Sequence, residues 1–467
     1  MMRPRFTALA ASCMLVATVG VAAVDTAVGS QKAVLPNSTP LAKFSKVSDI
    51  VVEKCMACHS RGYDLPFYAM IPGIKGIIEK DYKDGLRAMD LNLELVEAAK
   101  DKPIGEATLA KMEWVIQNDT MPPAKFTAIH WGSKLPPADK IAILDWVKTS
   151  RAAHYATGLA APAHANEPIQ PLPASLPVDS LKAAVGELLF NDKRLSGDNT
   201  VACASCHASE KGGTDNLRFS EGVRKQLGDI NAPTVFNAAF NVKQFWNGRA
   251  ADLQEQAGGP PMNPIEMDSK NWEEIIAKLA QDEGLTTTFT TVYPDGWSGD
   301  NITNAIAEYE KTLITPDSRF DKWLKGDATA LTETEVAGYQ RFKAYRCSSC
   351  HVGKSVGGQS FEYMDLKKDY FADRGGKLGS DEGLKAFTGK DEDLHRFKVP
   401  NLRNIELTGP YMHDGTVTTL DDAVRIMGIY LSGMEIHQGD RDRIVSFLRT
   451  LTGEHEGKPL SGTVIPN

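Results

Sequence analysis

The sequence predicts a mainly α-helical protein built from three units of one outline, with the last two packed as a single body. Three observations lead to this prediction. The motif C-x-x-C-H occurs three times in the 467 residues. Each copy is enclosed by two stretches with helical spacing of apolar residues. One proline-rich break separates the first unit from the other two. A chain of this length is also too long for one ordinary core, so several domains are expected.

The first 25 residues predict export. A basic start, MMRPR, precedes an uncharged stretch from Phe6 to Val24 that ends in small residues. This pattern is typical of a signal peptide, and the stretch is also long enough for an N-terminal membrane anchor. We therefore expect residues 1–25 to be one or the other, and the protein to lie in the periplasm, soluble or anchored to the inner membrane. The formal net charge of -8 argues against nucleic acid as a partner.

The three units are predicted at residues 26–160, 179–325 and 326–467. In each, a helix leads into the motif, a loop-rich middle follows, and a helix closes the region, which is the outline of a cytochrome c fold. The leading stretches carry Phe44, Val47, Ile50 and Val51, then Val185, Leu188 and Leu189, then Val336, Tyr339 and Phe342. The closing stretches carry Ile141, Leu144 and Val147, then Ile302, Ile306 and Tyr309, then Ile444, Phe447, Leu448 and Leu451.

Residues 161–178 predict a linker. The run APAHANEPIQPLPASLP contains five prolines, which favour a semi-rigid extended chain. No comparable break separates the second unit from the third, so those two are expected to pack together.

The C-x-x-C-H motif attaches haem c, because two thiols form thioethers to the haem and the histidine binds its iron. Zinc sites and thioredoxin-like pairs are the alternatives, but three copies behind an export segment favour three covalent haems c. The attachment residues are Cys55 and Cys58 with His59, Cys203 and Cys206 with His207, and Cys347 and Cys350 with His351.

Methionines are the candidate ligands for the other face of each iron, because a thioether opposite histidine makes an electron carrier. Met121, in NDTMPPAKF, is the candidate for the first haem, with a core methionine as the alternative. Met427 and Met434 both follow the third motif, and spacing does not choose between them.

The second haem leaves two possibilities open. Met262 and Met267 lie at workable distances after His207, and Glu266 lies between them. Either a methionine closes this iron, or the iron is open and Glu266 moves a proton between the oxygens of a peroxide.

From Leu181 onward the chain resembles the bacterial dihaem cytochrome c peroxidases. The shared stretches are CASCH, NAPTVFNAAFNVKQFWNGRAADLQEQAGGP, PIEM, TLITPDSRFDKWLKGD, VPNLRNIELTGPYMHDGTV and AVRIMG. With its N-terminal unit, which includes MPPAKFTAIHW, the chain is most similar to the trihaem members that oxidise quinol.

This resemblance implies roles for individual residues. The haem at His207 would be the peroxidatic one, with Glu266 as its acid and base and Gln256 beside it. Trp246 would lie between the second and third haems and help electrons to cross. Met427 in RIMG falls where the family places a thioether ligand, which favours it over Met434, and Met121 matches the ligand of the extra haem.

The family also binds a calcium ion between its two haem domains. The matching positions are Asn231 and the backbone carbonyls of Thr408 and Pro410, and oxygen ligands suit calcium. His413 lies in a matched motif, and we expect it to be a hydrogen-bonded structural histidine.

One loop departs from the dihaem pattern. Many dihaem enzymes carry a histidine there that blocks the peroxidatic iron until the enzyme is reduced. This chain has Val223 at the aligned position, and residues 208–230 contain no histidine or methionine. Lys211 and Lys225 bind iron only after a costly deprotonation. We therefore expect an open second iron in the resting protein.

The predicted function is reduction of hydrogen peroxide to water, with electrons from quinol or a small cytochrome c. A MauG-like oxidising maturation enzyme is one alternative, although those enzymes have tyrosine where this chain has Met427. A multihaem electron-transfer cytochrome without peroxidase activity is another. A homodimer is also expected as a possible assembly.

Overall fold

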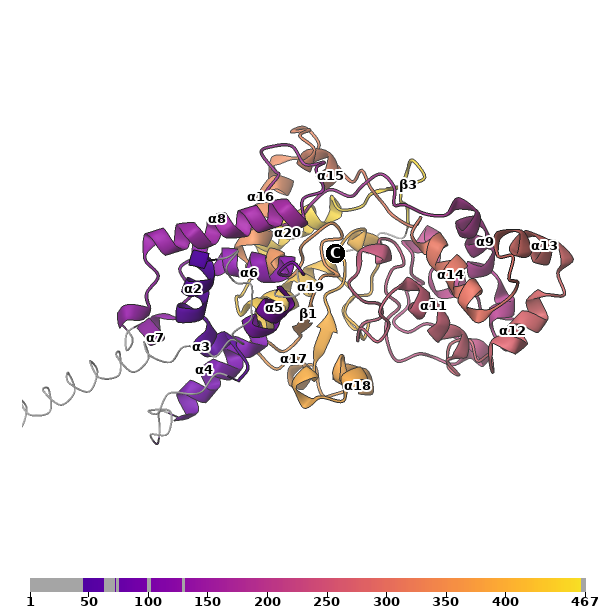
Figure 1. Cartoon of the computed structure of the whole chain (residues 1–467), viewed down its shortest axis with the longest axis horizontal. Coiled ribbons are helices and arrows are strands. Elements are labelled where there is room, and N and C mark those ends of the chain that lie inside the picture. Colours follow the sequence, from indigo (N-terminus) through magenta and orange to yellow (C-terminus); the bar gives the residue numbers. More distant parts are fainter. Residues whose placement is uncertain (1–44, 63–71, 73–74, 99–101, 128–130, 463–467) are drawn as a thin grey trace, which may run out of the picture. The chain divides into compact units, whose positions relative to one another are not determined.

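The computed structural model describes residues 45–62, 72, 75–98, 102–127 and 131–462 (Figure 1). The predicted export segment, residues 1–25, lies outside the described residues. The chain divides into two compact units, Met1–His154 and Tyr155–Asn467. Within the described ranges, no helix is both long and apolar enough to cross a membrane.

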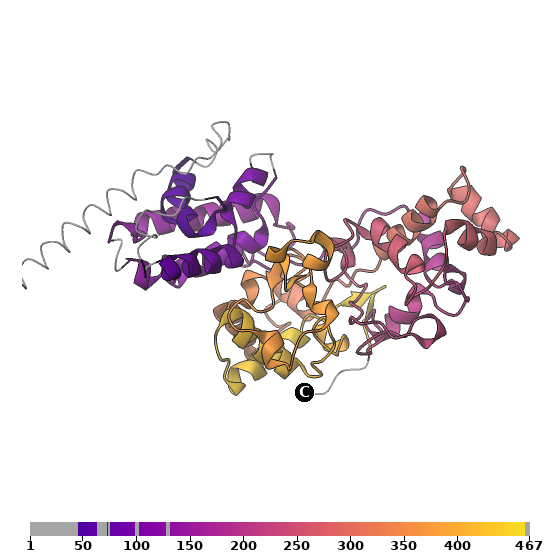
Figure 2. The same cartoon turned by 90° about the horizontal axis from the view of Figure 1, so that it is seen from below.

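The N-terminal unit is helical, and its helices lie side by side in Figure 2. Its helices are α2 (Ser45–Lys54), α3 (Met56–His59), α4 (Lys75–Ala88), α5 (Leu91–Ala98), α6 (Glu106–Gln117), α7 (Ala124–Thr127) and α8 (Pro137–His154). The leading helix α2 packs on the closing helix α8. Arg151 of α8 is 1% exposed and donates to Glu106 of α6 at 2.6 Å, which ties these two helices together.

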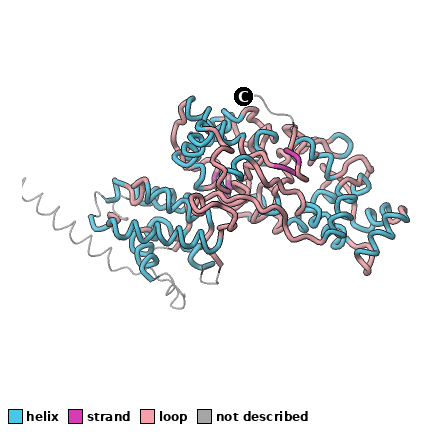
Figure 3. The backbone as a smooth tube through the Cα atoms, turned by 90° about the horizontal axis from the view of Figure 1, so that it is seen from above, coloured by secondary structure: helices cyan, strands magenta, loops and turns pink. Residues whose placement is uncertain are grey.

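The C-terminal unit consists of short helices and long loops, with very little strand (Figure 3). Around the second motif lie α9 (Ser180–Phe190), α10 (Cys203–Cys206), α11 (Leu253–Met262), α12 (Trp272–Leu279), α13 (Glu283–Val292) and α14 (Gly299–Glu310). Around the third lie α15 (Arg319–Leu324), α16 (Glu333–Ala344), α17 (Tyr370–Asp373), α18 (Lys385–Thr388), α19 (Leu420–Met427) and α20 (Gln438–Arg449). The strands are β1 (Phe361–Tyr363) with β2 (Arg396–Lys398), and β3 (Glu454–His455) with β4 (Lys458–Pro459). The prediction of a mainly α-helical protein is confirmed.

Each motif of this unit is flanked by a leading and a closing helix that pack on each other, α9 on α14 and α16 on α20. Both pairs cross at a glycine. A Cβ at Gly186 would lie 1.9 Å from the carbonyl oxygen of Ala305, and one at Gly338 would lie 1.9 Å from that of Arg443. The six helices that enclose the three motifs, predicted from apolar spacing, are present.

Two apolar clusters form the core of the C-terminal unit. One surrounds Leu189, Phe236 and Phe289, and Cys203 packs against it. The other surrounds Phe320, Tyr339 and Phe447, and Cys347 packs against it. Each haem motif of this unit therefore starts from its own core.

The proline-rich segment lies along the C-terminal unit. Ile169 and Leu172 are fully buried there, and Ile169 pairs with Gly353 just after the third motif. The fully buried guanidinium of Arg403 donates to Asp321 at 2.8 and 2.9 Å and to the carbonyl of Gln170 at 3.2 Å. This contact fastens the segment to α15 and to the loop that carries Arg403.

Candidate active site

The three motif histidines share one arrangement. The Nδ1 atom of His59 lies 3.2 Å from the carbonyl oxygen of Met89. His207 and His351 make the same contact, with Gly213 at 3.4 Å and Val356 at 3.2 Å. A carbonyl only accepts, so Nδ1 carries the proton and Nε2 keeps a free lone pair. Burial lowers the pKa of all three, that of His351 to about 4, so each imidazole is neutral. This is the form in which histidine binds a metal.

Among the described residues, the six motif cysteines form no disulfide. Burial raises the pKa of Cys55, Cys203 and Cys347 to about 12. Each motif brings together two thiols and one histidine, which is the set that thioether attachment of haem c uses. Within the described ranges, no three His, Cys, Asp or Glu side chains form a group that could hold a metal ion.

Glu266 lies beside the second motif, at the end of α11. Two prolines, Pro260 and Pro261, end this helix, and Asn263 turns the chain by accepting from the N–H of Ile265 at 3.0 Å. The Asn263 amide then donates to Glu266 Oε1 at 2.9 Å. The carbonyl of Glu266 accepts from the N–H of Val223, and Val223 and Cys203 belong to the same apolar cluster, so this turn lies near the haem attachment point. Burial raises the pKa of the Cys203 and Cys206 thiols, and the charge of Glu266 adds to this rise. Burial raises the pKa of Glu266 itself.

The loop with Val223 is fastened to the Glu266 turn. Val223 is fully buried in the apolar cluster of the second motif, and its N–H donates to the carbonyl of Glu266 at 2.9 Å. Gln226 donates to the carbonyl of Pro264 at 3.0 Å, and Arg224 pairs with Asp268. We call residues 222–226 the latched loop. Val223 aligns with the blocking histidine of many dihaem enzymes, and its side chain lies in the core.

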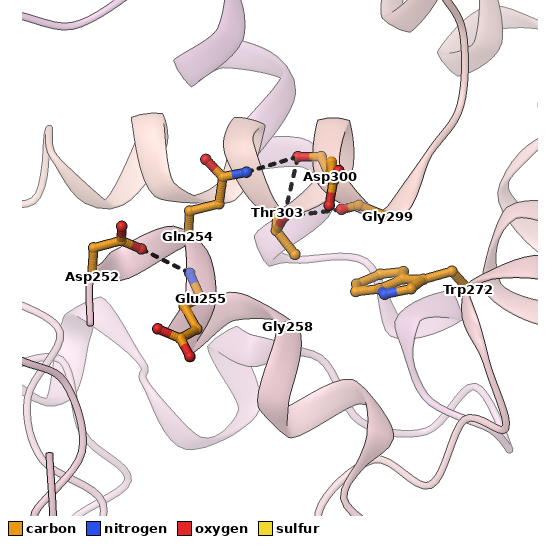
Figure 4. A pocket seen from close by; sticks show the side chains of 8 residues that line it. All are labelled: Asp252, Gln254, Glu255, Gly258, Trp272, Gly299, Asp300 and Thr303. Carbon is orange, nitrogen blue, oxygen red and sulfur yellow. Dashed lines mark hydrogen bonds between the residues drawn. The ribbon is translucent and has the colours of Figure 1, made fainter. Parts of the chain in front are cut away.

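Gln256 lies on α11, half-buried, and its amide makes no hydrogen bond to another described side chain. A pocket of about 350 Å³ lies beside the same helix, lined by Asp252, Gln254, Glu255, Gly258, Trp272, Gly299, Asp300 and Thr303 (Figure 4). This pocket contains none of the residues that we predict to act in the site.

Trp246 and Asn231 connect the surroundings of the second and third motifs. The indole N–H of Trp246 donates to the carbonyl of Asn231 at 2.9 Å, and the N–H of Asn231 donates to the carbonyl of His413 at 2.7 Å. His413 is 2% exposed and contacts Asp381 at 2.7 Å, and its ring stacks on Phe397. These contacts agree with a structural role for His413, and they bring Asn231 to the segment that contains Thr408 and Pro410.

The predicted methionines lie in different settings. Met427 ends α19 and packs against the third-motif cluster, and a π-helical turn, Gly428–Ser432, follows at once. Such turns are frequent at functional sites. Met267 is 2% exposed within the second-motif cluster, and Met262 packs against it. Met121 is 36% exposed.

Sequence reasoning missed two residues that act on Glu266. Arg249 stacks on the ring of Phe245 at 3.4 Å, and its charge lowers the pKa of Glu266, as does the Asn263 amide. The sequence does contain a signal for Asn263, because asparagine directly before a proline favours a turn that its side chain stabilises. No sequence pattern indicates the role of Arg249, because its effect depends on a loop that meets the Glu266 turn only in the folded structure.

Comparison with known proteins agrees with this site. Residues 180–329 match the model of the di-haem cytochrome c peroxidases, and residues 14–149 match that of a haem-binding domain. Cytochrome c peroxidase Ccp of Escherichia coli is 51% identical over 419 residues, 89% of each chain. Cytochrome c551 peroxidase of Nitrosomonas europaea is 46% identical over 293 residues, 62% of this chain and 85% of that one. In fold, a MauG-like protein associated with microbial copper homeostasis matches with a TM-score of 0.54 at 28% identity, covering 61% of this chain and 93% of its own.

These matches define a haem peroxidase with an additional haem-binding domain in front. The chain belongs to the di-haem cytochrome c peroxidase family, whose members are oxidoreductases that act on peroxide and carry covalently bound haem c. The predicted enzyme class and the predicted family are thereby confirmed.

Proposed function

We propose that the protein reduces hydrogen peroxide to water in the periplasm with electrons relayed through three covalently bound haems c. Residues 26–160, 179–325 and 326–467 each hold one haem, and residues 161–178 connect the first unit to the others. Electrons from quinol or a small cytochrome c enter at the haem of His59 and Met121 and pass to that of His351 and Met427. They cross near Trp246 to the haem of His207. Peroxide takes up two electrons and two protons there and leaves as two waters.

One observation carries this proposal: a half-buried carboxylate near Cys203 and Cys206, next to a loop that has a buried valine where many dihaem enzymes have a blocking histidine. Glu266 acts on both thiols, and Val223 points into the core. An electron carrier has no use for an acid at this place. A peroxidase needs one, because a proton must move between the peroxide oxygens before their bond breaks.

The side chains around Glu266 suit this proton transfer. A haem held by His207 supplies the iron that binds peroxide and the electrons that cleave its O–O bond. Glu266 accepts the proton of the bound oxygen and donates it to the other oxygen, which departs as water. Its raised pKa brings the carboxyl closer to the working pH, where it gives and takes a proton with similar ease. Asn263 fixes Oε1, and Gln256 offers an amide to orient the substrate.

A calcium ion belongs to the same proposal, held by Asn231 and the carbonyls of Thr408 and Pro410. Carbonyl and amide oxygens are suitable calcium ligands. The buried Oδ1 of Asn216, whose amide donates to the carbonyls of Leu407 and Gly409, has no hydrogen-bond partner in the described structure. An acceptor oxygen in this position fits a nearby cation. Attachment to the inner membrane through residues 1–25, and a homodimer, complete the proposal.

Two other functions are less well supported. A MauG-like maturation enzyme shares the fold, but this chain has a methionine, Met427, where those enzymes place tyrosine. A pure electron-transfer cytochrome requires Met262 or Met267 on the second iron, and it leaves the half-buried carboxyl of Glu266 without a role.

The test is anaerobic stopped-flow spectroscopy of the fully ferric protein with one equivalent of hydrogen peroxide. We expect a high-spin ferric signal that converts without prior reduction. The Glu266→Gln variant should react about 10²- to 10⁴-fold more slowly, the usual effect of losing a general acid and base. Glu273→Gln, on the exposed start of α12, is the matched control and should react like the wild type.

Other outcomes are equally informative. A reaction that begins only after the third haem is reduced means that a residue blocks the second iron at rest. If the reduced protein does not react either, the peroxidase proposal is wrong and the electron-carrier alternative gains support.

A further inference from the structure

Lys398 is a largely buried lysine. Its side chain is 6% exposed. Burial alone lowers its pKa to about 8, and no charged group of the described residues acts on it. A largely buried ammonium is stabilised by pairing, so this side chain suits an anion that does not come from the polypeptide.

The strand pair β1–β2 determines where the side chain lies. Lys398 is paired directly with Phe361, and residues opposite each other share one face of an antiparallel pair. The ring of Phe361 lies against Gly248, where a Cβ would be 2.3 Å from it. The Lys398 side chain therefore faces the loop that follows Trp246. The carbonyl of Trp246 accepts from the backbone N–H of Lys398 at 2.8 Å.

The buried acid of this strand pair, Glu362, lies on the other face. Glu362 is opposite Phe397, and it accepts from the Ser360 hydroxyl at 3.0 Å. The ring of Phe397 stacks on that of His413, which fills this second face. Neither acid nor histidine from that side reaches Lys398.

The same strand leads to the third haem ligand. The N–H of Val399 donates to the carbonyl of Ser360, and its carbonyl accepts from the N–H of Gly358. The next residue, Pro400, is in close contact with Gly357, where a Cβ would lie 2.1 Å from the Pro400 carbonyl oxygen. That carbonyl also acts on the ring of His351. Lys398 is two residues before Pro400, between the proximal side of this haem site and Trp246.

We propose that Lys398 binds a propionate carboxylate of the haem attached at Cys347 and Cys350, as an ion pair next to Trp246. This inference rests on the three-haem assignment made above. A haem carries two carboxylates on one edge, and a charge-assisted hydrogen bond from an ammonium is the contact that a buried carboxylate requires. The pair places a positive charge beside the haem that hands electrons to the second site.

The test is the reduction potential of each haem, measured by spectroelectrochemistry on the full haem-loaded chain. Lys398→Met removes a positive charge and should lower the reduction equilibrium constant of the third haem about tenfold, or about 59 mV for one electron. Lys398→Arg keeps the charge and should restore most of the loss. Lys390→Met, the same change at an exposed position of this unit, should leave all potentials unchanged. An unchanged third potential in Lys398→Met, or a shift confined to the second haem, overturns the proposal.

A second measurement does not use the Lys398→Met variant, so it gives a result even if that variant does not fold. Redox-difference infrared spectra of the wild type with ¹³C-labelled propionates should show an ionised carboxylate whose bands move in Lys398→Arg. Label-sensitive bands of a protonated acid, or bands that ignore the arginine, contradict the ion pair. The mass of the intact chain gives the haem count independently, so a missing third haem is distinguished from a wrong partner for Lys398.

Discussion

At the scale of single residues, the site depends on backbone carbonyls and amides that set the state of a few side chains. One carbonyl holds Nδ1 of each motif histidine and leaves Nε2 free. Asn263 does the corresponding work for Glu266, since its amide favours the ionised carboxylate while burial disfavours it. The balance of these two effects sets the pH at which Glu266 is able to accept a proton.

Asn263→Ala tests this balance. Loss of the hydrogen bond removes a contribution that lowers the pKa of Glu266, so the pKa should rise further above its usual value. Because the reaction begins with ionised Glu266, the acid limb of the pH–rate profile for peroxide should move to higher pH. A hydrogen bond to a charged group corresponds to about one pH unit. Stopped-flow rates across the pH range measure the limb, and a limb that stays in place contradicts the role of Asn263.

Glu310 gives a second prediction at this scale. It is 4% exposed at the end of α14, and burial raises its pKa from 4.5 to about 8. Between these values the folded protein keeps the proton and the unfolded chain releases it. The contribution of Glu310 to the free energy of unfolding should therefore fall as the pH rises through this window, by at most about 1.4 kcal/mol per unit. Urea titrations of the wild type and of Glu310→Gln at both ends of the window measure this contribution as the difference between the two slopes. Equal slopes in the two proteins would contradict the buried, protonated state of Glu310.

At the scale of elements, each haem motif of the C-terminal unit is supported by a leading helix and a closing helix in close contact. Gly186 and Gly338 allow α9 to meet α14, and α16 to meet α20, at backbone contact. The two pairs flank the second and third motifs, so the same crossing supports both haem regions of the C-terminal unit.

Gly338→Ala should therefore destabilise the C-terminal unit. The added methyl group would lie 1.9 Å from the carbonyl oxygen of Arg443, and the helices must separate to admit it. Overpacking of this kind costs about 1–3 kcal/mol. Gly439→Ala is the matched control, because Gly439 lies at the exposed start of α20, where the nearest atom is a flexible arginine end at 3.9 Å. It should be neutral or slightly stabilising. Thermal unfolding of the haem-loaded proteins measures both, and equal effects would contradict the close crossing.

At the scale of the whole molecule, the sequence predicted the periodic features well. Apolar spacing located the helices around all three motifs, because a 3.6-residue repeat is a local property. The resemblance identified the family. Asn263, Arg249 and Lys398 were not predicted, since their roles depend on segments distant in the chain that meet only after folding. The proline-rich segment was expected to be a linker, and its composition gave no sign that Ile169 and Leu172 are buried along the C-terminal unit.

Electron entry is a prediction at this scale, because it concerns the N-terminal unit while the proposed peroxide site lies in the C-terminal unit. Met121→Leu should remove the thioether of the first haem and lower its potential, since methionine ligation raises it. Donor-driven turnover should fall about tenfold or more. The reaction of the ferric protein with peroxide should not change. Met112→Leu, a volume-conserving change at a buried position of α6, is the control. Equal effects of the two variants would show that Met121 does not bind the first iron.

The latched loop also affects how soon the reaction starts. Val223 is buried and its N–H donates a hydrogen bond to the carbonyl of Glu266, and the Arg224–Asp268 ion pair holds the same turn. A segment held at both ends has no second resting position from which it must move before the reaction starts. We expect the first turnover to be as fast as every later one, with no lag after a period without donor. A cell that meets a sudden burst of peroxide would be protected from the first molecule onward.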